Sequence, residues 1–307
     1  VLPYIGLGAE HFTSEKLEDN GQINLLKTGI YFSDAITTVS PTHAREILEP
    51  VGGQGLAPYL NNRRADLFGI LNGVDYDDWN PATDKLIPAT FSSKNLRGKA
   101  TCKRALQDRF GLNPDPTRPV FGIVSRFAYQ KGFGLLTQIL PYALSQMRMQ
   151  FVVLGTGDKD TEDYFHWLTA THPGQVGSYI GFSNELSHLV EAGSDFFLMP
   201  SLYEPCGLNQ IYSLKYGTLP IVRATGGLAD TVENYSEATG DGTGFVFGSA
   251  TPAALFDTIG WAVSTYFDRP QHIARMQKKA MALDFSWPKA AREYETVYAH
   301  AIRNRRL

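Results

Sequence analysis

The sequence predicts an α/β protein whose second half forms a doubly wound parallel sheet. Short runs rich in β-branched and aromatic residues alternate there with longer stretches whose apolar residues recur at helical spacing. Strands joined by helical crossovers run parallel within one sheet. The 307 residues, 43% of them hydrophobic, exceed the size at which a single core stops growing, about 250 to 300 residues. We therefore expect two units.

Each element of the second half follows from a local pattern. Apolar runs bounded by turn residues predict strands at 120–125, 151–154, 178–182, 195–200, 219–223 and 245–247. Helical spacing of apolar residues predicts helices at 134–147, 161–171, 186–192, 208–216 and 253–266.

The first hundred or so residues repeat this alternation less completely. The patterns predict helices at 23–32 and 95–110, strands at 35–39 and 67–71, and a helix that begins after Ser40-Pro41, an N-cap followed by proline. Two strands cannot form a stable sheet that is covered on both faces. Residues 1–112 are therefore expected to be the end of an N-terminal α/β domain whose earlier strands are absent. A first residue other than Met agrees with a piece of a longer protein.

Composition excludes several classes of function. The formal net charge of -3 and the scattered basic residues argue against nucleic-acid binding. The two cysteines, Cys102 and Cys206, lack the spacing of a metal site or a disulfide framework, so a reducing, intracellular compartment is expected. No apolar stretch reaches the roughly 18 residues that a membrane span needs, and no signal-like segment opens the chain.

A carboxylate stands where open α/β sheets bind ligands. Glu204 follows the apolar run 196–199 and precedes the helix-forming residues 211–216. Ligands of such sheets bind outside the carboxyl ends of the strands. Glu204 therefore marks a candidate active site, which its neighbour Tyr203 could line.

Two cations, Arg126 and Lys131, follow the first strand of the second half. Both could hold one diphosphate, Arg through two parallel hydrogen bonds and Lys as a point charge. Each charge-assisted hydrogen bond contributes about 1.5 to 3 kcal/mol. Taken alone, two solvated loop cations are the commoner explanation of such a pair.

Glycines and helix starts follow other strands. Residues 155–158 suggest a dinucleotide-binding turn, but the third glycine of that motif would fall at Asp160, so a tight turn is favoured. Leu208 and Asn209 open a helix whose exposed N–H groups can meet an anion. The glycine pair 226–227 either lets backbone approach a ligand or forms a simple loop. The convergence of these groups with the cations and Glu204 at one sheet edge carries the functional prediction.

Longer motifs extend these observations over nearly the whole chain. They stand at 24–29, 37–41, 71–75, 125–126, 130–132, 204–210, 215–220, 225–232 and 284–287. Together they resemble the bacterial-type glycogen and starch synthases, the ADP-glucose-dependent family-5 glycosyltransferases. The family's Lys-x-Gly-Gly-Leu loop and its sugar-contacting His are not in this sequence, so the chain resembles an N-terminally truncated member.

The resemblance implies a GT-B fold, in which two Rossmann-like domains with parallel sheets face each other across a cleft. It implies that the N-terminal domain is incomplete here. The implied domains are 1–112, the end of the acceptor-side domain; 113–117, a proline-rich linker; 118–283, the nucleotide-sugar-binding domain; and 284–307, a helix that crosses back to the first domain.

The resemblance also implies a reaction. Glucose would pass from ADP-glucose to the non-reducing end of an α-1,4-glucan, glycogen or starch, with retention of anomeric configuration. The implied partners are ADP-glucose and the glucan, with no metal, cofactor, nucleic acid or membrane. The implied location is the cytoplasm, or the plastid in a plant or alga. We expect little or no activity from these 307 residues alone.

The resemblance assigns roles to individual residues. Arg126 and Lys131 would hold the donor diphosphate, Glu204 would position the glucose, Asn72 would reach the sugar from the other domain, and Phe182 would stack on adenine. The full set of further substrate-binding residues that it implies is Asn72, Gly181, Phe182, Cys206, Gly207, Leu208, Asn209, Tyr212, Gly226 and Gly227. At the position of Tyr212, many other retaining GT-B enzymes carry a second glutamate.

Two other functions stay open. One is a non-catalytic nucleotide- or glucan-binding fragment of such an enzyme, and the other is a phosphorylase-like enzyme with a lysine-bound pyridoxal phosphate, for which no further motif is found. Trp79 and Trp287 are expected to be packing residues. The histidines lack paired ligand spacing, so a surface position is expected rather than a metal site for His11, His43, His166, His172, His188, His272 and His300.

Overall fold

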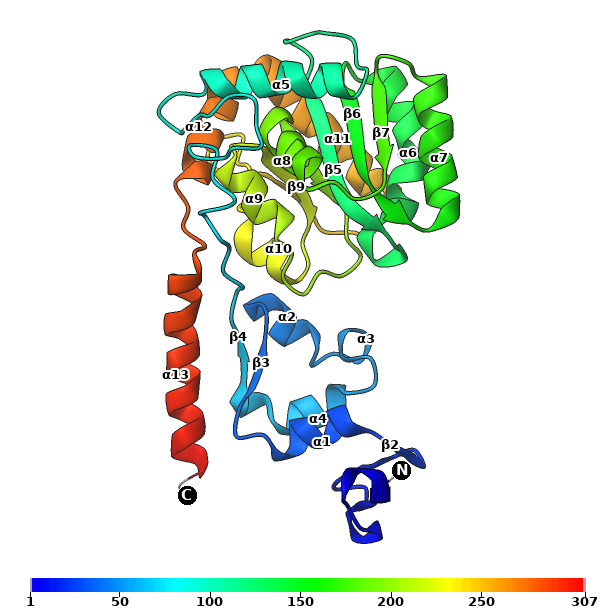
Figure 1. Ribbon diagram of the computed structural model, residues 1–307, viewed down its shortest axis with the longest axis vertical. Coiled ribbons are helices and arrows are strands. Elements are labelled where there is room, and N and C mark those ends of the chain that lie inside the picture. The colour runs from blue at the N-terminus through cyan, green and yellow to red at the C-terminus, as the bar shows by residue number, and fades with distance from the viewer. Residues whose placement is uncertain (1, 306–307) are drawn as a thin grey trace.

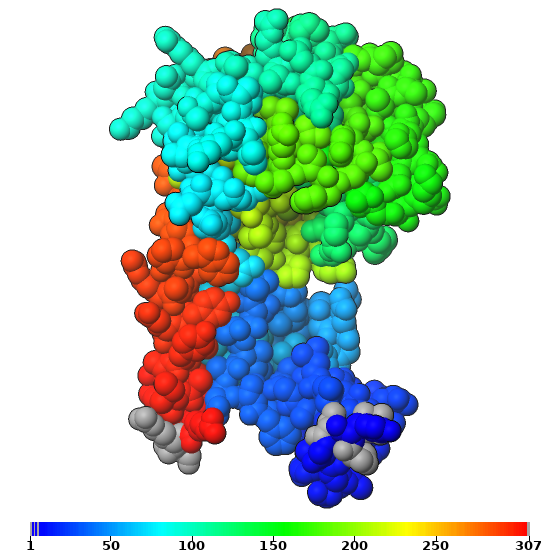
Figure 2. Space-filling model, viewed as in Figure 1, coloured from blue at the N-terminus to red at the C-terminus, as the bar shows by residue number. Residues whose placement is uncertain are grey.

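The computed structural model describes residues 2–305 and consists of two bodies, with the larger above the smaller in Figure 1. The larger body holds a parallel sheet covered on both faces by helices. The smaller body holds a two-stranded parallel sheet, a short hairpin and four short helices. The two bodies meet over part of their width, and an open notch separates them on the side away from the C-terminal helix (Figure 2).

The sheet of the larger body has six parallel strands in the order β10-β9-β8-β5-β6-β7. The chain builds outward from β5 to β7, then returns to the other side of β5 and continues through β8, β9 and β10. This order creates a switch point between β5 and β8, where open sheets bind ligands. The strands are β5 (Val120–Phe127), β6 (Gln150–Gly157), β7 (Val176–Ile180), β8 (Phe196–Met199), β9 (Leu219–Arg223) and β10 (Phe245–Phe247).

Helices cover both faces of this sheet, which explains its uninterrupted apolar strands. One face packs against α6 (Phe133–Gln146), α7 (Lys159–Thr171) and α11 (Pro252–Asp268). The other face packs against α5 (Arg97–Arg109), α8 (Asn184–Gly193) and α10 (Gly226–Thr231). The remaining helices of this body are α9 (Asn209–Lys215) and α12 (Pro270–Met281).

The smaller body pairs β3 (Ile36–Thr38) with β4 (Leu67–Gly69) in parallel register. Its helices are α1 (Leu25–Phe32), α2 (Pro41–Glu46), α3 (Pro50–Gly53) and α4 (Ala57–Asn62), and a short hairpin pairs β1 (Glu18–Asp19) with β2 (Gln22–Ile23). Short 3-10 turns occupy Leu2–Ile5, Ala9–His11, Arg64–Asp66 and Tyr129–Lys131.

Side-chain caps set the starts of five helices. In α1, α2, α7, α8 and α11, the side chain just before the helix accepts a hydrogen bond from the backbone N–H three residues later. Ser40 with Pro41 was the cap predicted from sequence. The tight turn expected at 155–158 is wrong, because residues 155–157 end β6 and Asp158 caps α7 directly after it. The capping residues are Asn24, Ser40, Asp158, Ser183 and Thr251.

The expected boundary at 112 does not match the packing of α5. This helix lies on α8 of the larger body, where Lys99 Nζ donates a hydrogen bond to the Ala192 carbonyl oxygen at 3.0 Å. Leu106 is fully buried in the larger body's core. The chain has therefore left the smaller body before residue 97, because the apolar face of α5 is complementary to α8.

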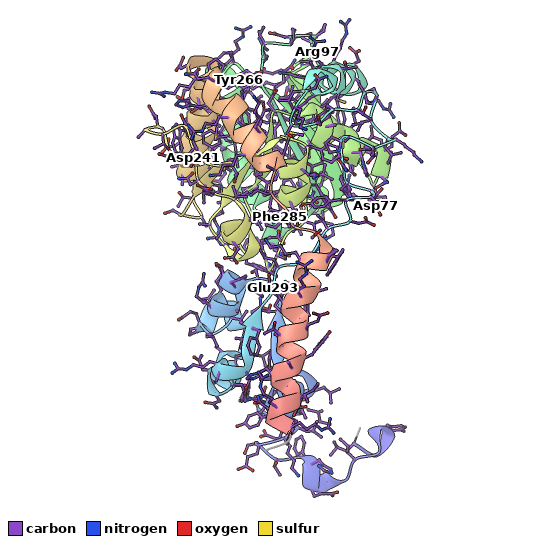
Figure 3. The ribbon with its side chains drawn as sticks, turned by 90° about the vertical axis from the view of Figure 1, so that its left-hand side faces the viewer. Asp77, Arg97, Asp241, Tyr266, Phe285 and Glu293 are labelled. Atoms are coloured by element: carbon purple, nitrogen blue, oxygen red, sulfur yellow. The ribbon has the colours of Figure 1, made fainter. Side chains whose placement is uncertain are left out.

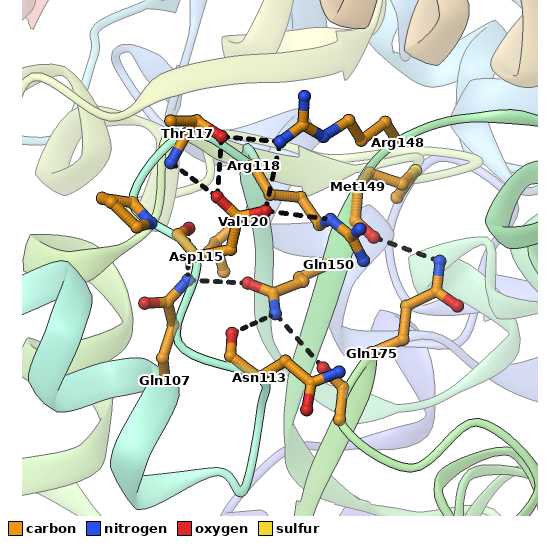
Figure 4. A network of polar contacts seen from close by, with 12 residues as sticks. Gln107, Asn113, Asp115, Thr117, Arg118, Val120, Arg148, Met149, Gln150 and Gln175 are labelled. Atoms are coloured by element: carbon orange, nitrogen blue, oxygen red, sulfur yellow. Dashed lines mark hydrogen bonds and ion pairs between the residues drawn. The ribbon is translucent and has the colours of Figure 1, made fainter.

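The expected linker 113–117 is fastened to the larger body by a polar network (Figure 4). Asp115 accepts hydrogen bonds from Thr117 N at 2.9 Å and from Arg148 Nη2 at 3.3 Å. The Thr117 hydroxyl, followed by the backbone and Arg148, lowers the pKa of Asp115 to about 2. Gln150 Nε2 donates to the Asn113 carbonyl oxygen at 2.7 Å. This segment is part of the domain surface and does not join the two bodies.

The last helix, α13 (Trp287–Arg305), runs beside the smaller body (Figures 1 and 3). His300 Nε2 lies 3.0 Å from Asp66 Oδ1, and Asn304 Nδ2 lies 3.0 Å from the same oxygen. Where the chain returns to the smaller body, Val74 N donates to the Phe285 carbonyl oxygen at 2.8 Å. The two segments that pass between the bodies therefore lie side by side.

Candidate active site

The predicted site residues of the larger body gather in a pocket of about 340 Å³ at the switch point between β5 and β8. Arg126, Lys131 and Glu204 all line it, although Glu204 is 73 positions beyond Lys131. Asn209 and its two predecessors complete one wall at the start of α9. The pocket therefore combines two cations, one carboxylate and a helix start at the carboxyl edge of the sheet.

Lys131 and Glu204 form an ion pair in this pocket. Lys131 Nζ donates to Glu204 Oε2 at 2.6 Å, and the Ser201 hydroxyl donates to the same oxygen at 3.1 Å. Glu204 is only 5% exposed. A buried carboxylate needs such partners, because an unpaired buried charge is strongly destabilising. Ser201 is a residue that the sequence patterns did not single out.

Arg126 differs from Lys131 in having its charge exposed at the pocket wall. Among residues 2–305, its guanidinium makes no hydrogen bond or ion pair with another side chain. A planar guanidinium in this position can bind the oxygens of an anion with two parallel hydrogen bonds.

A close backbone contact places Lys131 beneath the loop that carries Glu204. Gly132 has a φ of +73°, and a Cβ there would lie 1.9 Å from the Pro200 carbonyl oxygen. Leu202 N donates to the Gln130 carbonyl oxygen at 2.8 Å. Only glycine allows this approach, which brings the lysine and the glutamate together.

Asn209 uses its side chain to join α9 to β5. Its Nδ2 donates to the Val124 carbonyl oxygen at 2.8 Å. This bond holds the first turn of α9 against the pocket, with the backbone of Leu208 and Asn209 at the wall.

The glycine pair 226–227 approaches the protein's own backbone. A Cβ on Gly226 would lie 1.8 Å from the Glu204 carbonyl oxygen, and one on Gly227 would lie 2.1 Å from the Cys206 carbonyl oxygen. The alternative of a simple loop at 226–227 is wrong, because these residues begin α10. The two glycines let α10 pack directly against the loop that carries Glu204.

Asn72 reaches this loop from the segment between the two bodies. Its backbone contacts the Cys206 thiol, whose pKa is raised chiefly by burial. On the other side, Gln210 Nε2 donates to the carbonyl oxygens of Cys206 and Gly207 at 3.0 and 3.1 Å. The loop after Glu204 is therefore held from both sides.

Other predicted site residues lie outside this pocket. Gly181 and Phe182 follow β7 at the edge of the sheet, two strands from β5, and the Phe182 ring is 85% exposed. Tyr212 stacks on Trp79, with ring centroids 4.0 Å apart and planes 6° apart. This stack confirms that Trp79, which is partly buried, is a packing residue.

The prediction that every histidine lies at the surface is wrong for His188. This residue is fully buried, its Nδ1 lies 2.9 Å from Asp84 Oδ2, and its ring stacks on Trp79. Tyr216 donates its hydroxyl to the same Asp84 oxygen at 2.5 Å. The polar face of α8 is covered by the segment around Asp84, which lies 104 positions away in the sequence.

A second hollow of about 440 Å³ lies between the bodies and is mostly apolar. Its walls come from α1 to α4 of the smaller body and from the loop around Glu204. They include Leu26, Ile47, Val51, Leu202, Tyr203 and Pro205. Tyr203 therefore faces the space between the bodies. No helix within residues 2–305 is long and apolar enough to cross a membrane.

Two family models match the chain. Residues 1–62 match the starch synthase catalytic domain, and residues 105–280 match the glycosyl transferases group 1. Glycogen synthase 1 of Geobacter metallireducens is 50% identical over 305 residues, and the glycogen synthase of Treponema denticola is 49% identical over 306 residues. These alignments cover 99% and 98% of this chain.

A solved structure is similar over nearly the same length. The catalytic domain of starch synthase IV from Arabidopsis thaliana, bound to ADP and acarbose, has a TM-score of 0.89 and 34% identity over 96% of this chain. The chain spans only 61% and 62% of the two glycogen synthases and 62% of the starch synthase chain. These findings confirm the predicted fold class, GT-B with an incomplete N-terminal domain, and the predicted family resemblance.

Proposed function

The chain belongs to the glycosyl transferases group 1 family, and we propose that this protein adds glucose from ADP-glucose to the non-reducing end of an α-1,4-glucan. The product would be glycogen or starch, as the names of the similar synthases suggest. The observation that carries the proposal is the shared pocket of Arg126, Lys131 and Glu204. It offers positive charge for a diphosphate beside a buried carboxylate for a sugar.

The two cations would hold the donor diphosphate. Cleavage of the bond between the sugar and the diphosphate adds negative charge to the phosphates, so fixed cations stabilise the transition state more than the ground state. Arg126 would contribute two parallel hydrogen bonds and Lys131 a point charge. The N–H groups at the start of α9 would add to this site, and the two cations would take the place of a metal ion.

Glu204 would position the glucose and stabilise positive charge on its ring. The backbone N–H groups of Cys206 and Gly207 would hold sugar hydroxyls, and Asn72 would contribute from the other side of the loop. Support comes from the two-sided anchoring of this loop by Asn72 and Gln210.

The reaction would retain the configuration at the anomeric carbon through attack on the front face. The bond from the anomeric carbon to the diphosphate oxygen breaks, and a bond to the acceptor hydroxyl oxygen forms on the same face. A leaving phosphate oxygen takes the acceptor proton, so ADP and the lengthened glucan are the products. Glu204 forms no covalent intermediate in this scheme.

Adenine and the glucan would bind at the edges of the pocket. The exposed Phe182 ring, next to Gly181, would stack on adenine. The acceptor would enter between the bodies, where Tyr203 lines the apolar hollow. We further propose that the smaller body is the acceptor side and that the protein acts in the cytoplasm or in a plastid.

A transfer assay tests this function. The protein of which the chain is part is given glycogen and either ADP-[14C]glucose or UDP-[14C]glucose. We expect label in the polymer from ADP-glucose, little from UDP-glucose, and release of all label by an enzyme that removes α-1,4-linked glucose. Tight ADP binding without transfer would favour the second candidate, a non-catalytic nucleotide-binding fragment. A strong preference for UDP-glucose would contradict the nucleotide assignment.

A further inference from the structure

A carboxylate of the smaller body reaches the start of a helix in the larger body. Glu46, the last residue of α2, accepts hydrogen bonds on Oε1 from the Thr225 hydroxyl at 2.9 Å and from Gly226 N at 3.0 Å. Its Oε2 lies 3.7 Å from His43 Nδ1. The carboxylate lines the apolar hollow and is not among the residues that line the pocket of Arg126 and Glu204.

A carboxylate of the larger body in turn contacts the start of a helix in the smaller body. Asp230 of α10 accepts hydrogen bonds from Thr42 N at 2.7 Å and from the Thr42 hydroxyl at 2.6 Å, at the start of α2. Each of the two short helices is thus capped at its N-terminus by a carboxylate of the other. A carboxylate at this end is favourable because it neutralises free backbone N–H groups.

Arg223 holds the loop before Glu204 and lies within the electrostatic influence of Glu46. It ends β9, and its guanidinium donates to the Ser201 carbonyl oxygen at 2.8 Å and to the Leu202 carbonyl oxygen. Burial lowers the pKa of Arg223, and the nearby Glu46 carboxylate opposes that effect. The negative charge of Glu46 therefore stabilises the buried guanidinium that binds this loop.

Both groups beside Glu46 act on the backbone around Glu204. Glu46 caps Gly226, and the N–H of the next residue, Gly227, donates to the Glu204 carbonyl oxygen at 3.1 Å. Ser201, whose carbonyl oxygen Arg223 binds, donates its hydroxyl to Glu204 Oε2 at 3.1 Å. One contact thus fixes the backbone of Glu204 and the other its carboxylate.

We propose that Glu46 is a positioning residue, which couples the approach of the smaller body to the orientation of Glu204 through Arg223 and the start of α10. The inference rests on the proposed function, because it assigns Glu204 to the glucose of ADP-glucose. The diphosphate part of the site lies on β5 and α9, which Glu46 does not contact. Loss of Glu46 should therefore weaken recognition of the sugar and leave recognition of ADP unchanged.

Calorimetric titrations of the full-length protein with ADP and with ADP-glucose test this separation. We expect Glu46→Ala to raise the Kd for ADP-glucose about fivefold to tenfold, the size expected for an ordinary hydrogen bond, because Glu46 acts on the sugar only through Glu204. The Kd for ADP should change less than about twofold. Glu46→Gln should give an intermediate loss, because its amide oxygen still accepts both hydrogen bonds but carries no charge toward Arg223. Glu49→Gln, an exposed residue nearby, is the matched control.

Arg223→Lys tests the same connection from the larger body. It keeps a positive charge beside Glu46 but loses the guanidinium that binds two carbonyl oxygens, so we expect the same selective loss of ADP-glucose affinity. Equal losses of affinity for ADP and ADP-glucose, or no loss for either, in folded Glu46→Gln and Arg223→Lys proteins would overturn this inference. The proposed function would remain intact. Failure of the unsubstituted protein to bind ADP-glucose would overturn the proposed function and this inference together.

Discussion

Lys131 Nζ lies 2.6 Å from Glu204 Oε2, so the cation assigned to the diphosphate also neutralises the carboxylate assigned to the sugar. The two side chains therefore cannot be removed independently. Loss of the lysine leaves a buried carboxylate without its counter-charge, which is destabilising.

We expect Glu204→Gln to lower kcat for transfer from ADP-glucose about 100-fold or more, because a neutral amide cannot stabilise positive charge on the sugar ring. The Kd for ADP should not rise, because Lys131, freed from its partner carboxylate, can still bind the diphosphate. Initial-rate measurements and ADP titration on the same preparation check both parts. Asp163→Asn, an exposed carboxylate on α7, is the control, and full activity of the Glu204 variant would contradict its assigned role.

Arg126→Ala should weaken ADP binding about tenfold or more, the size of a lost charge-assisted hydrogen bond. The melting temperature should stay the same, because the guanidinium is exposed and contacts no other side chain in the described part of the chain. Titration and thermal unfolding measure the two effects. Arg104→Ala on the exposed face of α5 serves for comparison, and equal ADP affinity in both variants would remove Arg126 from the site.

Gly226→Ala should destabilise the fold by about 3 kcal/mol. Its φ is +42°, and the added Cβ would lie 1.8 Å from the Glu204 carbonyl oxygen, so backbone strain and a steric clash combine. Gly248→Ala is the matched control, since a Cβ there meets nothing within 4 Å. Urea unfolding measures the difference, and equal midpoints for the two variants would show that the close approach is not required.

Glu191 predicts a dependence of stability on pH. Burial raises its pKa to about 8, against the opposing hydrogen bond from Ser213. Because the folded state holds this proton more tightly than the unfolded state, the stabilisation is complete below about pH 4.5 and is lost as the pH rises toward 8. The slope is on the order of 1.4 kcal/mol per pH unit. Glu191→Gln should lack this slope. The same decrease in the free energy of unfolding between pH 5 and 8 in both proteins would contradict the expectation.

Phe182→Ala should weaken ADP binding severalfold without changing stability, because the ring is 85% exposed and free to stack on a base. Tyr298→Ala, an exposed aromatic on α13, controls for surface aromatics in general. Fluorescence titration with ADP gives the comparison. Unchanged affinity in the Phe182 variant would place the adenine elsewhere.

Local patterns were sufficient to predict most elements of the larger body. β9 and β10 occupy their predicted ranges, because turn residues bound short apolar runs there. The pattern of α5 also predicts a helix, but an apolar face does not say which core it will join. That is why the expected boundary at 112 was wrong.

The site could be predicted where its residues directly follow strands. It could not be predicted where a residue's position depends on a contact with a residue far away in the sequence. Arg126, Lys131 and Glu204 gather as expected because parallel strands present their carboxyl ends at one edge, although their roles stay predictions. His188 appeared to lie on a polar face because its partner Asp84 is 104 positions away. Spacing in a sequence cannot show such a contact.

The paired crossings at Val74 and Phe285 limit how the bodies can move. Two adjacent connecting segments that are hydrogen-bonded to each other act as a hinge. They allow rotation of the bodies about one axis and resist twisting or sliding. A swing of this kind would change the gap above Glu204 along a single coordinate. Opening for substrate entry and shutting for chemistry would then be opposite ends of one rotation.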